Sequence, residues 1–404
     1  MEDIPWGTDS QLTDNQFYNR EEDLEFIKNL LNTTASGSPP TIMLSGTRGV
    51  GKTVFLKKVK KDMEEDYLIS YVDLTQVYSY QLGRLDEISL MHHFYKSWID
   101  ACNKKNFSTL VNKMRKFAIK KFKIKDVADV GGYPLPIPHS EEDFDKLIDF
   151  VMNMPQEIYN SHSKDLKGVI MIIDEFQALN DLDNTSNNSN KSNRLDRFLW
   201  LFRSFIQNQK NVAYVFSGSV NSKDTIIEKI AGRSGAFGGR MLTLQINPFN
   251  KETVYNYLKE RSPSLKLADS GFERFYSCTK GIPYYVNTFT KLLQKNVTLT
   301  DKNVIDEFQG GIPILADHFK QQWAGLNLSE QKILSYLVIK PIKREEIAKI
   351  MGRTSGSLSK ILNKLQKADL IISENGLYFI SQPLLKAWLK QEYEKRGVFP
   401  FRVV

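Results

Sequence analysis

A glycine-rich run has the residue types and the spacing needed to bind phosphate groups. It reads Gly46-Thr47-Arg48-Gly49-Val50-Gly51-Lys52-Thr53 and satisfies the pattern G-x-x-x-x-G-K-[ST]. Its glycines allow the backbone to form a nest of N–H groups around phosphate oxygens. Lys52 can supply a positive charge to the β and γ phosphates, and the hydroxyl of Thr53 can bind Mg²⁺. We therefore expect residues 46–53 to bind ATP or ADP.

Two adjacent carboxylates follow the most apolar strand candidate in the sequence. Residues 169–173 read Val-Ile-Met-Ile-Ile, and Asp174 and Glu175 come directly after them. A phosphate-binding loop requires a further carboxylate for Mg²⁺, so we expect Asp174 to bind the metal together with Thr53. Glu175 can orient and deprotonate the attacking water. The pair predicts hydrolysis of ATP in addition to binding.

Polar residues near two later strand candidates could complete such a site. Ser217 and Ser219 follow residues 212–216 and would approach the γ phosphate if that strand neighbours the phosphate-binding strand. Arg233 and Arg240 lie in a glycine-rich stretch before the last strand candidate, and a guanidinium there can stabilise charge in the transition state. We weigh Arg240 above Arg233 because it is attached to the strand. Either arginine could act in its own chain, act in a second copy, or be an ordinary surface residue.

The elements that must position these residues alternate between strands and helices, which is typical of an α/β fold with a parallel sheet. We expect a helix that begins at Asn19 with a capping box to Glu22, and further helices over 52–65, 84–124, 142–160 and 194–208. Residues 181–193 are rich in Asn and Ser and predict a loop. The expected strands cover residues 41–44, 68–74, 169–173, 212–216 and 241–246.

Composition and charge limit the class of protein. The 404 residues are 41% hydrophobic and 25% charged, as in ordinary globular proteins. No stretch approaches the ~18 apolar residues of a membrane span, and the N-terminus lacks the pattern of a signal peptide, so we expect a cytoplasmic protein without a membrane partner. Two cysteines offer no zinc motif. The length predicts several domains, and we divide the chain into an ATPase domain over 1–249 with a basic insert at about 104–166, a helical lid over 250–326 and a third domain over 327–404.

These motifs together resemble the archaeal-type P-loop ATPases, which are related to AAA+ and STAND NTPases. Residues 46–53 and the segment around Asp174 are similar to the family's Walker A and B motifs, and Gly239-Arg240 resembles its Gly-Arg before a strand. Phe17-Tyr18-Asn19-Arg20-Glu21 resembles the short motif ahead of the P-loop, and Lys280-Gly281-Ile282-Pro283 resembles the lid motif that approaches the nucleotide. The resemblance spans residues 17–290 and implies a P-loop NTPase fold with a helical lid. It also implies that the nucleotide is lined by Phe17, Asn19, Arg20 and Pro283.

Two departures from the AAA+ pattern accompany this resemblance. Ser217 and Ser219 stand where the AAA+ sensor asparagine is expected, and no clear sensor arginine follows Pro283. The insert at about 104–166 contains no motif of the family.

The last segment of the chain resembles a winged helix. Helical patterns cover residues 329–340, 344–351 and 355–368, and an Asn375-Gly376 turn predicts a hairpin over 370–380. In helix-turn-helix proteins the second helix of the motif enters the major groove of DNA. Residues 320–404 contain 15 Lys and Arg against 7 Asp and Glu, which favours duplex DNA over a protein as partner. The DNA contacts expected from this resemblance are Arg353, Ser355, Ser357, Lys360, Lys364 and Lys367.

The sequence therefore predicts a slow Mg-ATP-dependent ATPase that acts as a nucleotide-dependent switch and controls DNA binding through its winged helix. Two other functions fit the same residues. One is a STAND-like regulatory switch whose winged helix docks on protein, including a second copy of the chain. The other is a replication-initiator or loader ATPase.

Overall fold

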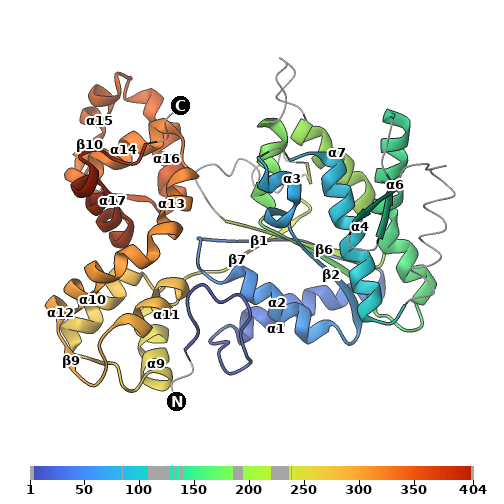
Figure 1. The fold of residues 1–404 in the computed structure, drawn as a ribbon, viewed down its shortest axis with the longest axis horizontal. Coiled ribbons are helices and arrows are strands. Elements are labelled where there is room, and N and C mark those ends of the chain that lie inside the picture. The colour runs from blue at the N-terminus through green and yellow to red at the C-terminus, as the bar shows by residue number, and fades with distance from the viewer. Residues whose placement is uncertain are drawn as a thin grey trace.

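The chain forms an α/β part, a helical lid and a C-terminal segment, which Figure 1 shows in sequence colours. The computed structural model describes residues 4–83, 85–107, 127–130, 133–136, 140–184, 194–219, 236–237 and 239–401.

A five-stranded parallel sheet forms the centre of the α/β part. Its strand order is β2-β5-β6-β1-β7, so β1 lies between β6 and β7. This order confirms the predicted parallel sheet, and it places residues 212–219 next to the strand that leads into the P-loop. The five strands are β1 (Thr41–Gly46), β2 (Tyr67–Asp73), β5 (Gly168–Asp174), β6 (Val212–Ser219) and β7 (Leu242–Gln245).

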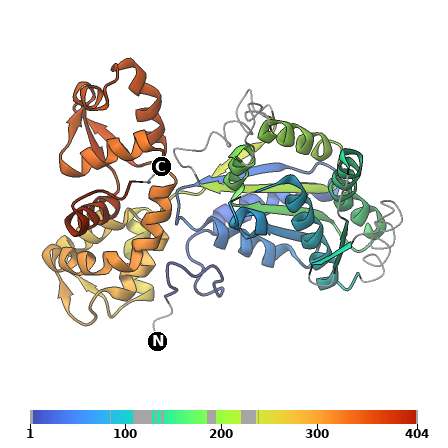
Figure 2. The same cartoon turned by 45° about the horizontal axis from the view of Figure 1, so that its top comes forward.

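Helices cover both faces of this sheet (Figure 2). All seven residues of β5 are buried, as expected for a parallel strand with covered faces. Its alternate side chains enter two different cores: Ile170 packs on the side of α1 and α2, and Met171 packs on the side of α4, α6 and α7. The helices of this part are α1 (Glu21–Asn32), α2 (Lys52–Met63), α3 (Tyr78–Gln81), α4 (Glu87–Lys104), α6 (Glu141–His162) and α7 (Arg194–Ile206).

Several boundaries differ from those predicted. Residues 181–184, which we expected in a loop, end a 3₁₀ helix over Phe176–Asn184, and the rest of that loop lies outside the described residues. Within the insert, β3 (Val127–Val130) and β4 (Tyr133–Pro136) form an antiparallel pair. Most of the basic block between residues 104 and 125 also lies outside the described residues.

The lid is helical, with one addition to the prediction. Two short strands, β8 (Lys266–Leu267) and β9 (Thr298–Leu299), pair in parallel. They lie in the connection before α10 and in the connection before α12. The lid helices are α9 (Lys251–Arg261), α10 (Asp269–Thr279), α11 (Pro283–Leu292), α12 (Asp301–Gly311) and α13 (Ala316–Ala324).

The C-terminal segment contains the three predicted helices and the predicted hairpin. Asn375 and Gly376 both have positive φ, as a two-residue type I′ turn requires. The third helix begins at Ser359 and not at Ser355, because residues 356–358 form a separate 3₁₀ turn. The elements are α14 (Leu328–Ile339), β10 (Ile342–Lys343), α15 (Arg344–Met351), α16 (Ser359–Lys367), β11 (Ile371–Glu374), β12 (Leu377–Ile380) and α17 (Pro383–Arg396).

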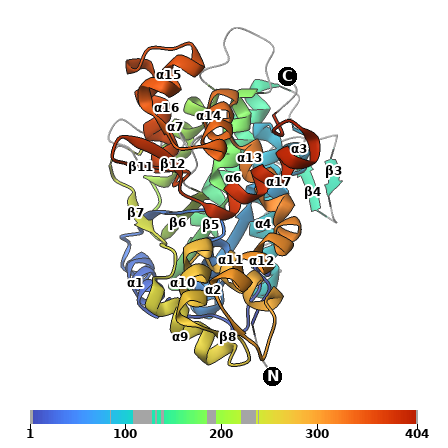
Figure 3. The same ribbon diagram turned by 90° about the vertical axis from the view of Figure 1, so that its left-hand side faces the viewer.

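The unpredicted helix α17 joins the C-terminal segment to the lid. Figures 1 and 3 show it beside α13, where the two parts meet. Trp388 of α17 stacks on Phe319 of α13 with ring centroids 5.8 Å apart, and the indole N–H of Trp323 donates to the carbonyl of Pro400 at 2.6 Å. One continuous core of buried side chains therefore runs from Phe249 to Phe399.

An ion pair inside the C-terminal segment involves one of the predicted DNA contacts. The carboxylate of Glu330 on α14 is 1% exposed, and the ammonium of Lys364 on α16 contacts it at 2.9 Å. The N–H of Asn327 also donates to Glu330, as part of a capping box. A buried carboxylate requires such partners, so the half-buried Lys364 has a structural role beside Glu330, and its contact with DNA stays a prediction.

No helix in the described part of the chain combines the length and the apolar character that a membrane crossing needs.

We predict that Lys364→Ala lowers the free energy of unfolding by about 1–3 kcal/mol, because it leaves the buried carboxylate of Glu330 short of a charged partner. Urea unfolding followed by circular dichroism measures this. Lys360→Ala, an exposed site on the same helix, should change stability by no more than about 0.5 kcal/mol. Equal effects of the two variants would contradict the structural role of Lys364.

Candidate nucleotide site

The phosphate-binding loop joins β1 to α2 at the carboxyl edge of the sheet. β1 ends at Gly46 and α2 begins at Lys52. Gly49 and Gly51 have φ of 82° and 98°, in the left-handed region that favours glycine. Gly49 also lies against the lid, since a Cβ there would be 2.8 Å from Cβ of Tyr284. The loop therefore depends on glycine both for its turns and for its contact with the lid.

Lys52 lies over this loop. Its side chain is buried, and its ammonium donates to the carbonyls of Gly46 at 2.9 Å and Thr47 at 3.2 Å. The hydroxyl of Thr47 is buried and has no hydrogen-bond partner within the described residues. The loop thus combines the ammonium of Lys52 with the N-terminus of α2, which suits an anionic phosphate.

Asp174 is the centre of the polar network at this edge of the sheet. Its carboxylate has no solvent exposure. Thr53 and Tyr71 donate to Oδ2 at 2.7 and 2.6 Å, and Ser217 donates to Oδ1 at 2.5 Å. The N–H of Glu175 also donates to Oδ1 at 3.0 Å. The structure thus brings Thr53 and Asp174 together as predicted, and it shows the hydroxyl of Ser217 bonded to the carboxylate of Asp174.

Tyr71 was not identified from the sequence. Parallel pairing of β2 with β5 sets Asp73 opposite Asp174 and Tyr71 two positions earlier, so its hydroxyl can reach the carboxylate. Burial and the charge of Asp174 raise the pKa of Tyr71 above its ordinary range, so the phenol remains a donor. Only the strand register could have revealed this contact.

Glu175 has a strained backbone and a perturbed carboxyl group. Its φ is 54°, an uncommon value for a residue with a side chain and one that clusters at functional sites. Burial and the neighbouring Asp174 raise the pKa of Glu175, while Lys52 and Arg48 oppose the rise. Gln177 donates to its carboxylate. A carboxyl group with a raised pKa beside a phosphate-binding loop is suited to act as a general base.

A cavity of about 80 Å³ lies beside the loop, between the N-terminal segment and the lid. Phe17, Arg20 and Pro283 line it, as the resemblance implied. Tyr18 and Tyr257 line it too and were not predicted; their rings meet at 5.0 Å. The lining combines aromatic rings with polar side chains, as binding sites for small molecules commonly do.

Asn19, which we expected to line the nucleotide, lies elsewhere. It has φ of 52°, and its side-chain amide donates to the hydroxyl of Thr253 on α9 at 3.2 Å. The helix begins at Glu21 after Arg20, with no side-chain cap, so the capping box predicted for Asn19 and Glu22 is wrong. The reason is the left-handed backbone at Asn19, which turns its side chain toward the lid. Asn19 is absent from the residues that line the cavity.

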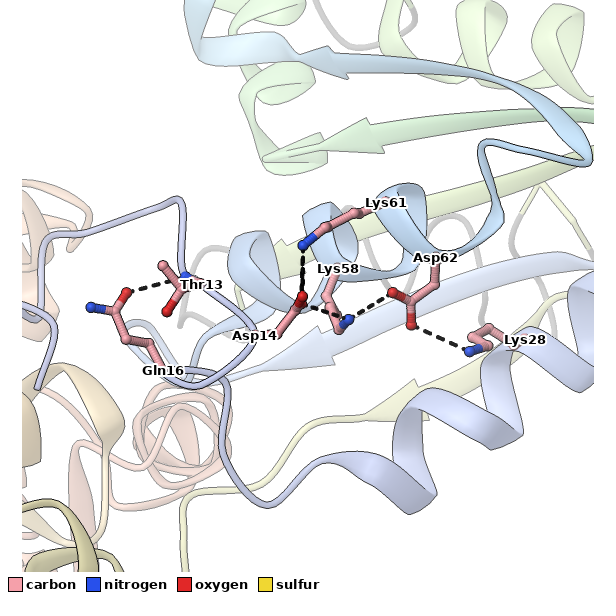
Figure 4. A network of polar contacts seen from close by, with 7 residues as sticks. All are labelled: Thr13, Asp14, Gln16, Lys28, Lys58, Lys61 and Asp62. Atoms are coloured by element: carbon pink, nitrogen blue, oxygen red, sulfur yellow. Dashed lines mark hydrogen bonds and ion pairs between the residues drawn. The ribbon is translucent and has the colours of Figure 1, made fainter. Parts of the chain in front are cut away.

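The N-terminal wall of the cavity is held on α2 by charged contacts (Figure 4). Asp14 contacts Lys58 at 3.0 Å and Lys61 at 2.9 Å, and these lysines keep the pKa of Asp14 below its ordinary value. Asp62 connects the same network to Lys58 and to Lys28 of α1. Since Gln16 and Phe17 follow directly, the network sets the position of the wall relative to the P-loop.

The lid is bonded to the P-loop at two points. The backbone N–H of Tyr284, at the start of α11, donates to the carbonyl of Gly49 at 3.1 Å. The guanidinium of Arg48 donates to the side-chain amide oxygen of Gln321 on α13. Arg48 therefore faces the lid, which sequence reasoning did not anticipate for a residue inside the P-loop motif.

Arg240 lies at the opposite edge of the sheet from the P-loop. It comes just before β7, whose first residue pairs with Ile42, whereas the loop starts at Gly46. At ~3.3 Å per residue the four positions from Ile42 to Gly46 separate the first residue of β7 from the loop by about 13 Å, and Arg240 lies two residues farther away. Arg240 lines a different cavity, with Pro40 and Gln207. It cannot reach the phosphates of its own chain in this arrangement; Arg233 and the side chain of Ser219 lie outside the described residues.

The remaining DNA-contact candidates surround the start of α16. Ser355, Ser357 and Lys360 are exposed, while Arg353 is exposed and donates to the hydroxyl of Ser329 at 3.3 Å. The hydroxyl of Ser357 donates to the carbonyl of Thr354 at 2.8 Å. The side chain of Lys367 lies outside the described residues.

Comparison with solved structures found a similar fold in the first of the two proteins described next. The Walker-type ATPase PABY2304 of Pyrococcus abyssi is similar over 95% of this chain and 99% of its own, with a TM-score of 0.62 and 17% identity. The ORC2 protein of Aeropyrum pernix in its ADP form matches with a TM-score of 0.43 and 13% identity over 95% of each chain. A comparison with curated proteins found no match.

A family model described as an ATPase domain predominantly from Archaea matches residues 17–289. The match covers most of the chain and contains the P-loop, Asp174 and Pro283. The chain therefore belongs to this family of ATPase domains, and it is an ATPase with a P-loop NTPase fold.

Proposed function

We propose that the protein binds Mg-ATP, hydrolyses it slowly and uses the nucleotide state to control duplex DNA binding by a C-terminal winged helix. The observation that carries the proposal is the continuous core from Phe249 to Phe399, which connects the lid at the P-loop to the C-terminal segment. Movement of the lid with the nucleotide would then move the C-terminal helices.

The residues at the P-loop fit Mg²⁺. The Thr53 hydroxyl and the Asp174 carboxylate are 2.7 Å apart, and both are oxygen ligands of the kind this ion prefers. When bound with ATP, Mg²⁺ would neutralise charge on the phosphates. The four donors around Asp174 fix the direction of its oxygens.

We assign phosphate binding to Lys52 and activation of water to Glu175. The ammonium of Lys52 would leave the loop carbonyls for the β and γ phosphates, where its charge has a stronger partner. Glu175 would accept a proton from the attacking water. Arg240 lies too far from its own P-loop, so we assign any contribution it makes to the nucleotide site of a second copy.

The C-terminal segment has the element order of a winged helix, with three helices and a three-stranded antiparallel sheet in the order β10-β12-β11. The exposed Lys360 and Arg353 can contact phosphates, and Ser355 and Ser357 at the turn before α16 can approach base edges. Residues 320–404 carry a net positive charge, which favours DNA.

A STAND-like switch is the second candidate. The bonds from Gly49 to Tyr284 and from Arg48 to Gln321 hold the lid on the P-loop. In that function the lid and winged helix form a closed state that a protein partner opens. ATPase turnover measured with and without duplex DNA, beside light scattering with ATP and ADP, separates the two: DNA stimulation supports the first function, and a closed monomer retaining ADP supports the second.

We predict that Lys52→Ala weakens nucleotide binding at least tenfold, because the β and γ phosphates lose a charged partner in a buried site. Isothermal titration calorimetry with MgADP and with a non-hydrolysable ATP analogue measures the affinity. Lys57→Ala, on the following turn of α2 and bonded to Ser10, is the control and should bind normally. Unchanged affinity in Lys52→Ala would remove the nucleotide from this loop.

We expect Glu175→Gln to retain Mg-ATP binding and to lose turnover by ~10²-fold or more, the contribution of a positioned base. Steady-state phosphate release measures it. Wild-type rates in this variant would assign the orientation of water to another group.

The same carboxyl group sets the pH dependence. Burial and Asp174 raise the pKa of Glu175 above its ordinary value of 4.5, and the active form is ionised, so turnover should fall on acidification with a midpoint above 4.5. This acid limb should be absent from the residual activity of Glu175→Gln.

The DNA function predicts salt-sensitive binding of the full chain to duplex DNA. Lys360→Ala should reduce the slope of log affinity against log salt by about one unit, because one phosphate contact is lost. Ser355→Ala should relax sequence preference more than it changes the slope. Lys302→Ala, on the exposed surface of the lid, is the control. If the full chain shows no salt-dependent affinity for duplex DNA at low ionic strength, the winged helix serves protein docking.

A further inference from the structure

Arg48 occupies an unusual position between the hydrolytic side of the site and the lid. It follows Thr47 in the P-loop and is half-buried. Its charge opposes the rise in the pKa of Glu175 and contributes to the fall in the pKa of His318 on α13, which burial lowers to about 3. The guanidinium bonds to Gln321 on α13, so a cation of the P-loop lies against this helix.

The partner of Arg48 in this arrangement is weak for a guanidinium. Its hydrogen bond within the described residues is to the neutral amide oxygen of Gln321, an exposed side chain. A guanidinium has five donors in a planar fork, and a phosphate offers it a negative charge and a pair of acceptor oxygens where the amide offers one neutral oxygen. A terminal phosphate arriving in the P-loop would therefore compete successfully for Arg48.

The helix that carries Gln321 is firmly attached to the C-terminal segment and only lightly to the P-loop. On its other faces Phe319 stacks on Trp388, and Gln322 donates to the side-chain oxygen of Gln382 at 2.9 Å. The carbonyl of Trp323 accepts from Gln331 of α14 at 2.9 Å. Figure 1 shows α13 at the junction of the lid and the C-terminal helices. Loss of the Arg48–Gln321 bond would remove this side-chain bond between the P-loop and α13, while the bond from Tyr284 to Gly49 would still hold α11 on the loop.

We infer that Arg48 exchanges Gln321 for the terminal phosphate of ATP, so that ATP, but not ADP, releases this bond between the P-loop and α13. The inference rests on the proposed nucleotide site and adds to it a positioning residue that distinguishes the two nucleotides. It also supplies a cation from the P-loop itself, in a chain whose lid has no clear sensor arginine after Pro283.

The exchange predicts that substitutions of Arg48 and of Gln321 have opposite effects on the affinity for an ATP analogue. Arg48→Ala removes the phosphate partner, so affinity for a non-hydrolysable ATP analogue should fall about tenfold while affinity for ADP is unchanged. Gln321→Ala removes the competitor, so affinity for the analogue should rise roughly threefold while affinity for ADP again stays the same. The measured quantity is the ratio of the two affinities, from calorimetry on the full chain with Mg²⁺.

Two further variants make the test specific. Gln322→Ala, the adjacent glutamine that bonds to Gln382, should leave the ratio unchanged. Gln321→Glu should lower the ratio by giving Arg48 a charged partner, and in the Arg48→Ala background the same change should have no further effect on the ratio. These glutamine variants also decide the question if Arg48→Ala does not fold.

The outcomes are distinct. If Arg48→Ala and Gln321→Ala both weaken both nucleotides, the contact merely docks the lid and the exchange is wrong. An unchanged or lowered ratio in Gln321→Ala also overturns it. If the wild-type chain binds neither nucleotide, the proposed nucleotide site fails instead.

Discussion

The carboxyl group of Asp174, which has no solvent exposure, determines how the elements around the site are arranged. Burying Asp174 at the end of the central strand β5 is costly unless its oxygens are fully bonded, and donors from β2, α2, β6 and the backbone N–H of Glu175 bond them. These donors can converge only if β5 lies between β2 and β6 and if the P-loop helix starts beside them. The strand order and the position of Thr53 are therefore parts of one arrangement. The backbone strain at Glu175, the next residue, arises where the chain leaves this network.

The sequence predicted features that are encoded locally. The glycines of residues 46–53 and the apolar run of 169–173 indicate the P-loop, the central strand and the metal-side carboxylate because each motif specifies its own backbone. It could not predict the contacts of Tyr71 and Ser217, which depend on strand register. The ion pair between Lys364 and Glu330 was hidden for a similar reason, since a lysine in a basic segment gives no sign of a buried partner on another helix.

Two features of the structure differ from the prediction because they depend on contacts between residues that are distant in the sequence. Asn19 and Glu22 have the spacing of a capping box, yet Asn19 takes a left-handed conformation and bonds to Thr253 in the lid. Helix α17 was not predicted, and its Trp388 packs in a core that combines side chains of the lid with side chains of the C-terminal segment. In both cases the missing information was the position of the lid.

The core shared by the lid and the C-terminal segment limits how this protein could be recombined. A cut between α13 and α14 would expose the buried faces of Phe319, Trp323 and Trp388 on its two sides. Exchange of the C-terminal segment with that of a relative would succeed only if the lid travelled with it, with the junction near Phe249, where the chain leaves the sheet. In such an exchange the lid and the C-terminal helices would be transferred together, and any binding specificity that they carry would be transferred with them.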